Sequence, residues 1–216
     1  MAPQISAVLF DLDGTLVETH IDFPAMKRAV ESLSPDAGVP VDVVTGKDIL
    51  GIIYTSVAWL DGAGRAGDEF RKRAFDELER LEVEGCRNPV EIPGAHRVLG
   101  ELARRGIRTG IVTRNCRKVA EDLLETFGLD AGVLLTRDDV PRVKPDPDHL
   151  GRALDKLGVE PDRSIMVGDH WMDIRAGVEA GCRLTVGVLY GRTSDFYAPA
   201  PPTYLAASIS DILDWI

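Results

Sequence analysis

The order of hydrophobic and polar positions divides the chain into two kinds of region. From about Ile92 onward, short apolar runs alternate with segments whose apolar side chains recur every three or four residues. The short runs predict strands, and the periodic segments predict helices. We expect strands at 7–10, 107–113, 132–136, 164–167 and 184–189, and helices at 95–105, 115–127, 147–157, 171–180 and 209–215.

The predicted strands carry apolar residues at nearly every position, as in Ile111-Val112 and Ile165-Met166-Val167. This pattern is typical of strands that are buried on both faces. Strands that alternate with helices build βαβ units. The sequence therefore predicts an α/β fold with a doubly wound, Rossmann-like parallel sheet, in which functional groups gather beyond the carboxyl ends of the strands.

Residues 18–88 interrupt this alternation. Apolar residues at helical spacing predict helices at 23–33, 46–60 and 69–84, a loop at 34–40 and a Gly-rich turn at 61–67, with no strand. Long insertions near strand ends often serve as lids. We therefore expect two domains, an α/β core of residues 1–17 and 89–216 and an all-helical cap of residues 18–88.

The strand at Ala7–Phe10 leads directly into Asp11, Asp13 and then Gly14-Thr15. Asp-Gly-Thr is a good turn sequence and needs no function to explain it. Buried carboxylates, however, are costly unless a cation or a hydrogen-bond donor neutralises them. Two of them at the end of an apolar strand indicate a site that holds a divalent cation and performs phosphoryl chemistry.

Polar groups also follow the other predicted strands. Because the carboxyl ends of parallel strands lie at one edge of a sheet, these groups should converge on Asp11. They supply carboxylates, a hydroxyl and a lysine, which suit Mg²⁺ binding and the transfer of a phosphoryl group. They are Thr113-Arg114-Asn115, Lys144 between two prolines, and Gly168-Asp169 with Asp173 four residues later. Asn115 is also well placed to cap the helix that follows it.

The segments Asp11-Leu12-Asp13-Gly14-Thr15, Thr113, Lys144 and Gly168-Asp169-x-x-x-Asp173 resemble, in this order, the four motifs of the haloacid dehalogenase superfamily. The helical insert resembles the small helical (C1-type) cap of that superfamily, and the most similar subfamily is that of phosphoglycolate-phosphatase-like hydrolases. The resemblance covers essentially the whole chain. It implies a Mg²⁺-dependent phosphatase of a small phosphomonoester, with a phosphoglycolate-like substrate possible.

The resemblance also implies a role for each acidic residue. Asp11 would attack phosphorus and form an aspartyl-phosphate. Asp13 would protonate the leaving alcohol and then deprotonate the attacking water. The Mg²⁺ ion would be bound by Asp11, the main-chain carbonyl of Asp13, and Asp169, with Asp173 supporting it directly or through water.

Substrate binding is implied for four residues that follow other strands. Thr113 and Lys144 would hold the phosphoryl oxygens, and the main-chain amides of Arg114 and Asn115 would contact the phosphate. Asp13 favours a phosphatase over a dehalogenase, since superfamily dehalogenases generally lack this second acid. Two alternatives stay open, a phosphotransferase such as a β-phosphoglucomutase-like sugar-phosphate mutase and a binding protein without enzymatic activity.

The amino-acid composition bears on which molecules the protein can bind. The 216 residues include 25 basic and 35 acidic side chains, and the net charge is −10. Such a chain is a poor general ligand for nucleic acid or anionic membranes, whereas a small phosphorylated metabolite needs only local positive charge. Three cysteines without a C-x-x-C pair and an N-terminus without a basic leader predict a cytoplasmic protein. Nothing in the sequence indicates an oligomeric state.

Overall fold

The computed structural model describes residues 4–216, and the chain forms two compact units. One unit consists of the chain up to Thr19 together with Pro89–Ile216, and the other is His20–Asn88. The expected domain boundaries, after residues 17 and 88, lie within two residues of these. The expectation of an N-terminus without a leader falls on residues 1–3, which lie outside the described residues.

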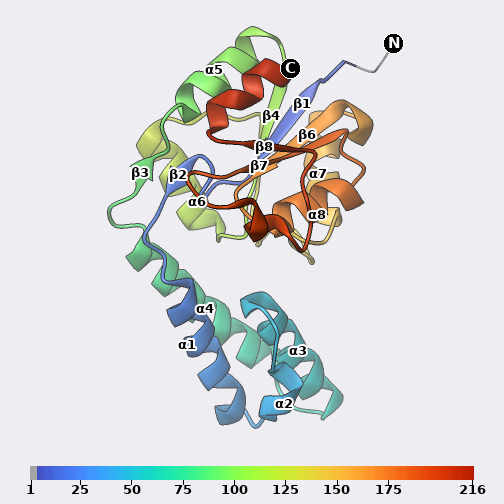
Figure 1. The fold of residues 1–216 in the computed structure, drawn as a ribbon. Coiled ribbons are helices and arrows are strands. Elements are labelled where there is room, and N and C mark those ends of the chain that lie inside the picture. The colour runs from blue at the N-terminus through green and yellow to red at the C-terminus, as the bar shows by residue number, and fades with distance from the viewer. Residues whose placement is uncertain (1–3) are drawn as a thin grey trace. The chain divides into compact units, whose positions relative to one another are not determined.

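The larger unit is built on a six-stranded sheet in which every pair of neighbouring strands is parallel (Figure 1). Its strand order is β5-β4-β1-β6-β7-β8, so that β1 is a central strand. The strands are β1 (Ala7–Phe10), β4 (Arg108–Val112), β5 (Val133–Leu135), β6 (Ser164–Gly168), β7 (Leu184–Val188) and β8 (Tyr204–Ala206). The predicted α/β fold with a parallel sheet is confirmed.

Helices cover both faces of this sheet (Figure 1). One face is covered by α7 and α8, which pack against each other, and the other face by α5 and η3, which also form a pair. The helices of this unit are α5 (Ala95–Arg104), α6 (Arg117–Phe127), α7 (Asp148–Leu157) and α8 (Trp171–Glu179), with 3₁₀-helices η1 (Pro161–Arg163), η2 (Ser194–Tyr197) and η3 (Ile209–Trp215).

The side chains of β1 are completely buried because the strand lies between two helical layers. Ala7 and Leu9 belong to a core cluster with Leu150 and Leu154 of α7, whereas the alternate residues of the strand point to the opposite face. Burial of a large apolar side chain contributes about 1.5–3 kcal/mol. This packing fixes β1, and with it the position of Asp11 one residue beyond its end.

Some short strands were not expected from the sequence. Strand β8 pairs with β7 at the edge of the sheet, yet Tyr204 and Leu205 are half exposed and the strand follows two prolines. A two-stranded antiparallel sheet joins β2 (Val17–Glu18) to β3 (Val90–Glu91). The expectation of no strand in residues 18–88 is therefore wrong at its first residue, because pairing with β3 extends the chain there.

The smaller unit consists of helices, as predicted. They are α1 (Phe23–Asp36), α2 (Val41–Val44), α3 (Ile49–Gly62) and α4 (Gly67–Gly85). The expected loop at 34–40 begins too early, because α1 continues through the buried Ser34, whose hydroxyl lies 3.1 Å from that of Ser56 in α3. Asp22 and Asp48 cap α1 and α3 by accepting main-chain hydrogen bonds of 2.7 and 2.9 Å. Among the described residues, no helix is both long enough and apolar enough to cross a membrane.

A buried tyrosine links the carboxyl ends of two strands beside the acidic residues. The Tyr197 hydroxyl lies 3.0 Å from each of the carbonyl oxygens of Gly168 and Val188, at the ends of β6 and β7. The ring packs over Gly187, where any β-carbon would collide with it. Tyr197 therefore fixes the end of β6, from which Asp169 emerges.

We predict that Tyr197→Phe lowers the free energy of unfolding by about 1–2 kcal/mol, because it leaves buried carbonyl groups without their donor. Urea unfolding followed by circular dichroism measures this change. Tyr204→Phe is the matched control, since Tyr204 is 43% exposed, and should change stability by less than about 0.5 kcal/mol. Equal effects of the two substitutions would contradict the role given to the Tyr197 hydroxyl.

Candidate active site

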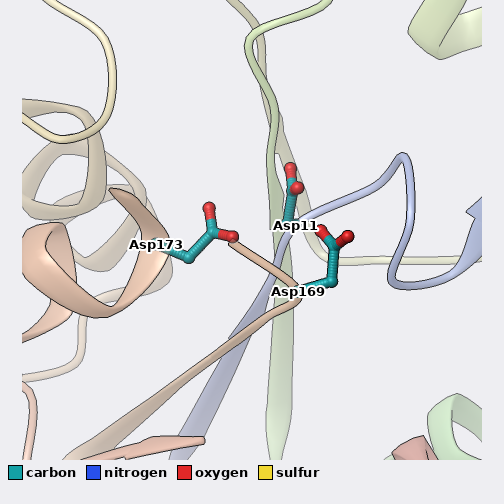
Figure 2. Close-up of side chains that lie close together, drawn as sticks. All are labelled: Asp11, Asp169 and Asp173. Atoms are coloured by element: carbon teal, nitrogen blue, oxygen red, sulfur yellow. The ribbon is translucent and has the colours of Figure 1, made fainter. Parts of the chain in front are cut away.

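Three aspartates from two parts of the chain converge beyond the carboxyl end of the sheet. Asp11 follows β1, Asp169 follows β6, and Asp173 lies in the first turn of α8. Each offers a carboxylate oxygen, and these oxygens all lie within 4.8 Å of one another. Figure 2 shows the three carboxyl groups close together. The predicted convergence of strand-end carboxylates is thus present in the structure.

Lys144 joins two of these acids. Its ammonium group lies 2.7 Å from Asp11 Oδ1 and 2.7 Å from Asp173 Oδ1, and its side chain is only 1% exposed. Burial opposes the charge of Lys144, but the charges of Asp11 and Asp173 outweigh that effect and raise its pKa. Burial raises the pKa of Asp11, and the neighbouring ammonium group limits this rise. The other oxygen of Asp173 accepts the main-chain N–H of His170 at 3.1 Å.

Two histidines support the main chain around these groups. The Lys144 N–H donates a 3.3 Å hydrogen bond to Nδ1 of the fully buried His149, whose pKa burial lowers to about 3. His170 caps α8 by accepting the N–H of Met172 at 3.2 Å, and burial lowers its pKa to about 4. Both rings are therefore neutral at pH 7. The position of His149, the second residue of α7, gave no signal of its contact with Lys144.

Asp13 does not belong to the cluster of three acids and lies in a tight turn two residues beyond Asp11. Its Oδ1 accepts the main-chain N–H of Thr19 at 3.1 Å, and burial raises its pKa to about 6. The turn requires Gly14, which has a φ of +83° and lies so close to Asp169 that a β-carbon would collide with that carboxyl group. The turn therefore places a carboxyl group of near-neutral pKa close to Asp11.

The loop after β4 departs from one expectation. Asn115 does not cap α6; its side-chain oxygen accepts the Thr113 hydroxyl at 2.6 Å. Cys116 is the N-cap residue, and the N–H of Arg117 is instead satisfied by Asp138 at 2.8 Å. The capping prediction is wrong because the main chain turns Asn115 back toward Thr113, whose hydroxyl also accepts the Asn115 N–H at 3.2 Å. Arg114 places its guanidinium against the sulfur of Met172.

Sequence reasoning missed Arg192. Its Nη1 donates to both the carboxylate Oδ2 and the carbonyl oxygen of Asp169, at 2.8 and 3.0 Å. Burial raises the pKa of Asp169 to about 7, and Arg192 opposes this rise. Arg192 lies four residues beyond the end of β7, so the rule that polar groups gather beyond strand ends could have found it.

The clustered side chains fit a divalent cation. Asp11, Asp169 and Asp173 are hard oxygen donors of the kind that Mg²⁺ prefers. Burial raises the pKa of Asp169, and the negative charges of Asp11 and Asp173 raise it further. A bound cation would neutralise these neighbouring negative charges.

We predict an unusual pH dependence of stability in the metal-free protein. The pKa of Asp169 is 3.8 when unperturbed and about 7 in the folded chain. Between these values the folded protein holds a proton that the unfolded chain has lost, so Asp169 makes the free energy of unfolding fall as the pH rises from about 4 to about 7. The slope from one such group is at most about 1.4 kcal/mol per pH unit.

Urea unfolding in EDTA across this pH range tests that prediction. Asp169→Asn should flatten the pH dependence relative to the unsubstituted protein. Asp162→Asn, at an exposed position of η1, should leave it unchanged. The same slope in the protein and in Asp169→Asn would show that Asp169 does not hold a proton in the fold.

Comparison with known proteins adds independent information. A family model described as a haloacid dehalogenase-like hydrolase matches residues 5–181. A phosphoglycolate phosphatase of Rhodospirillum rubrum is 32% identical, over 97% of this chain and 90% of its own length. An N-acetylmuramic acid 6-phosphate phosphatase of Pseudomonas aeruginosa is also 32% identical, over 87% of this chain and 83% of its own length.

A further relative carries a different enzyme name, and a solved structure has a similar fold. A pyrophosphatase PpaX of Halalkalibacterium halodurans is 32% identical, over 98% of this chain and 96% of its own length. The crystal structure of a predicted phosphoglycolate phosphatase from Haemophilus somnus has a TM-score of 0.67 at 26% identity and covers 98% of each chain. Both of these proteins match this chain over nearly its whole length.

Proposed function

Since the chain belongs to the haloacid dehalogenase-like hydrolase family, we propose that it is a phosphatase of small phosphomonoesters that carries the phosphoryl group on Asp11. The prediction of an enzyme of the hydrolase class is confirmed by the family. The observation that supports the proposal best is the Asp11–Lys144 pair, 2.7 Å apart, at the end of the central strand. It offers a carboxylate nucleophile beside a fixed positive charge.

Asp11 supplies the nucleophile in the proposed reaction. A carboxylate oxygen forms a bond to phosphorus as the bond from phosphorus to the leaving alcohol oxygen breaks. Lys144 favours the ionised form of Asp11 against the effect of burial, and it would neutralise charge on the phosphoryl oxygens. Asp173 holds Lys144 from its other side at 2.7 Å, so that the ammonium group stays directed at Asp11.

Asp13 moves the proton. A pKa of about 6 means that both its protonated and its ionised forms are accessible near neutral pH. The acid form donates a proton to the leaving alcohol oxygen. The carboxylate form then takes a proton from water, whose oxygen attacks phosphorus and releases Asp11 with inorganic phosphate.

The remaining groups would bind the phosphate and its counter-ion. Asp11, Asp169 and Asp173, with the carbonyl of Asp13, would hold Mg²⁺, which supplies positive charge to the phosphoryl oxygens when bound. The hydroxyl of Thr113 and the main-chain amides of Arg114 and Asn115 at the start of α6 would bind the same oxygens. The helical unit, residues 20–88, would serve as the cap.

The names of the relatives bear on the substrate. They include phosphoglycolate and N-acetylmuramic acid 6-phosphate phosphatases, both of which act on small phosphorylated molecules. We therefore propose a small phosphorylated metabolite, phosphoglycolate among the candidates, as the substrate. We also propose the cytoplasm as the setting, where the thiols of Cys86, Cys116 and Cys182, which form no disulfide, would stay reduced. A solved structure described as a β-phosphoglucomutase is 24% identical, shares the fold alone, and does not favour a mutase.

We predict that Asp11→Asn lowers kcat for 4-nitrophenyl phosphate and for phosphoglycolate by at least about a thousandfold, because the amide is a poor nucleophile. The protein should still fold, since Lys144 keeps its contact with Asp173. Steady-state phosphate release and circular dichroism measure the two properties. Asp162→Asn serves as the control, and retention of most of the activity in Asp11→Asn would exclude Asp11 as the nucleophile.

We predict that Asp13→Asn behaves differently with aryl and alkyl phosphates. An aryl oxygen leaves readily without a proton, so rapid mixing with 4-nitrophenyl phosphate should give a stoichiometric burst of nitrophenol followed by slow turnover. An alkyl phosphate needs the acid and should show no burst, with a rate about 10²–10⁴-fold lower.

The matched control for this experiment is Glu18→Gln, which removes a charge near Asp13 from an exposed residue. It should keep the kinetics of the unsubstituted enzyme with both substrates. If Asp13→Asn slows aryl and alkyl phosphates equally and shows no burst, Asp13 does not act as the proton donor.

A further inference from the structure

Arg192 has no role in the proposed reaction, yet its cationic side chain is in direct contact with the acidic cluster. It lies in the loop between β7 and η2, and one of its nitrogens, Nη1, donates to two oxygens of Asp169. One acceptor is the carboxylate Oδ2 and the other is the main-chain carbonyl. The guanidinium is therefore hydrogen-bonded to a carboxylate oxygen of Asp169, a residue that we propose binds the cation.

The position of Arg192 is built into the surrounding structure although its side chain is 44% exposed. The guanidinium lies over the ring of Phe196, 5.1 Å from its centre. The Phe196 ring in turn makes edge contacts with His170 and Tyr197, at centroid distances of 5.3 and 5.7 Å. Tyr197 is fixed by its hydrogen bonds to β6 and β7, and Phe196 packs against it. The Phe196 ring therefore holds Arg192 against Asp169.

The charges of the cluster show what this contact does. Asp11, Asp169 and Asp173 carry three negative charges when ionised, and Lys144 balances one of them. Arg192 balances a second. A divalent cation that enters the cluster therefore meets a nearby positive charge and competes with Arg192 for Asp169.

We propose that Arg192 sets the affinity of the acidic cluster for divalent cations by pairing with Asp169 in the metal-free protein. This inference rests on the proposed function, because it takes the three aspartates as the cation site. Arg192 stabilises the empty cluster and weakens cation binding, so that the ion remains exchangeable.

A different role for Arg192 would have the opposite consequence. If Arg192 served mainly to orient Asp169 for the cation, its removal would weaken binding. Asp169 is already confined by its close packing against Gly14, where a β-carbon would collide with the carboxyl group. Orientation therefore persists without the arginine, and the loss of its positive charge dominates.

The test is the binding of Mn²⁺, a spectroscopic probe for Mg²⁺ sites, to metal-stripped protein and to Arg192→Gln. Free Mn²⁺ measured by electron paramagnetic resonance should give a Kd roughly tenfold lower for Arg192→Gln, from the removal of one nearby charge. Arg192→Lys should stay near the unsubstituted protein because it keeps the charge. Arg175→Gln is the matched control, since Arg175 is equally exposed but pairs with Glu179, and its Kd should change by less than about twofold.

Thermal unfolding provides a second readout. In EDTA, Arg192→Gln should melt at a lower temperature than the unsubstituted protein because its carboxylates have lost a partner. In Mg²⁺ the difference should shrink, since the variant gains more from the cation. A merely structural role would lower the melting temperature equally in both conditions, and that result would overturn the inference.

The two proposals fail in different ways. In the first case, the unsubstituted protein binds Mn²⁺, Asp169→Asn abolishes this binding, and Arg192→Gln has an unchanged or higher Kd. This result overturns the role of Arg192 and leaves the cation site in place. If the unsubstituted protein binds no Mn²⁺, or Asp169→Asn binds it equally well, the cation site itself is wrong and the inference about Arg192 falls with it.

Discussion

The buried ammonium group of Lys144 is the interaction on which the acidic site depends. It lies 2.7 Å from both Asp11 and Asp173, so one positive charge holds together a carboxylate that follows β1 and a carboxylate in the first turn of α8. Removal of one partner from a buried ion pair lowers the free energy of unfolding by about 3–5 kcal/mol, because no water can take the place of that partner beside the remaining charge. The same contact that makes this edge of the sheet stable also opposes the rise in the pKa of Asp11 that burial causes.

The rest of the larger unit places the partners of Lys144. The central strand β1 is buried on both faces and carries Asp11 beyond its end. Strand β6, tied to β7 by Tyr197, leads to Asp169 and then to the first turn of α8, where Asp173 accepts the N–H of His170. His149 fixes the main chain of Lys144 from inside α7. Asp11, Lys144, Asp169 and Asp173 are thus each held in place by a buried residue or strand.

Much of the fold and the site could be predicted because it depends on local patterns. Continuous apolar runs predicted the central strands. The carboxylates of Asp11 and Asp169 directly after two of these strands predicted an acidic site at the carboxyl edge of the sheet. The groups that were missed act through side-chain contacts that the spacing of apolar and polar residues does not reveal. His149 meets Lys144 through a turn and a helix, and Arg192 reaches Asp169 from 23 residues away.

The other errors have similar causes. Strand β8 has only three residues and takes its structure from pairing with β7, which its own sequence pattern does not record. Asn115 binds the Thr113 hydroxyl and does not cap α6, because of the path that the main chain takes at this loop. Local preference sets which structures are available, and tertiary contacts select among them.

The central claim is that Asp11, activated by Lys144, carries the phosphoryl group. The most direct test is to mix the enzyme with a phosphomonoester and Mg²⁺, quench in acid within milliseconds, and map the phosphorylated peptide by mass spectrometry. The account predicts an acid-stable, hydroxylamine-sensitive phosphoryl group on Asp11 that disappears as substrate is consumed. Rapid turnover with no phosphorylated Asp11 at any quench time, or with the label on another residue, would contradict it.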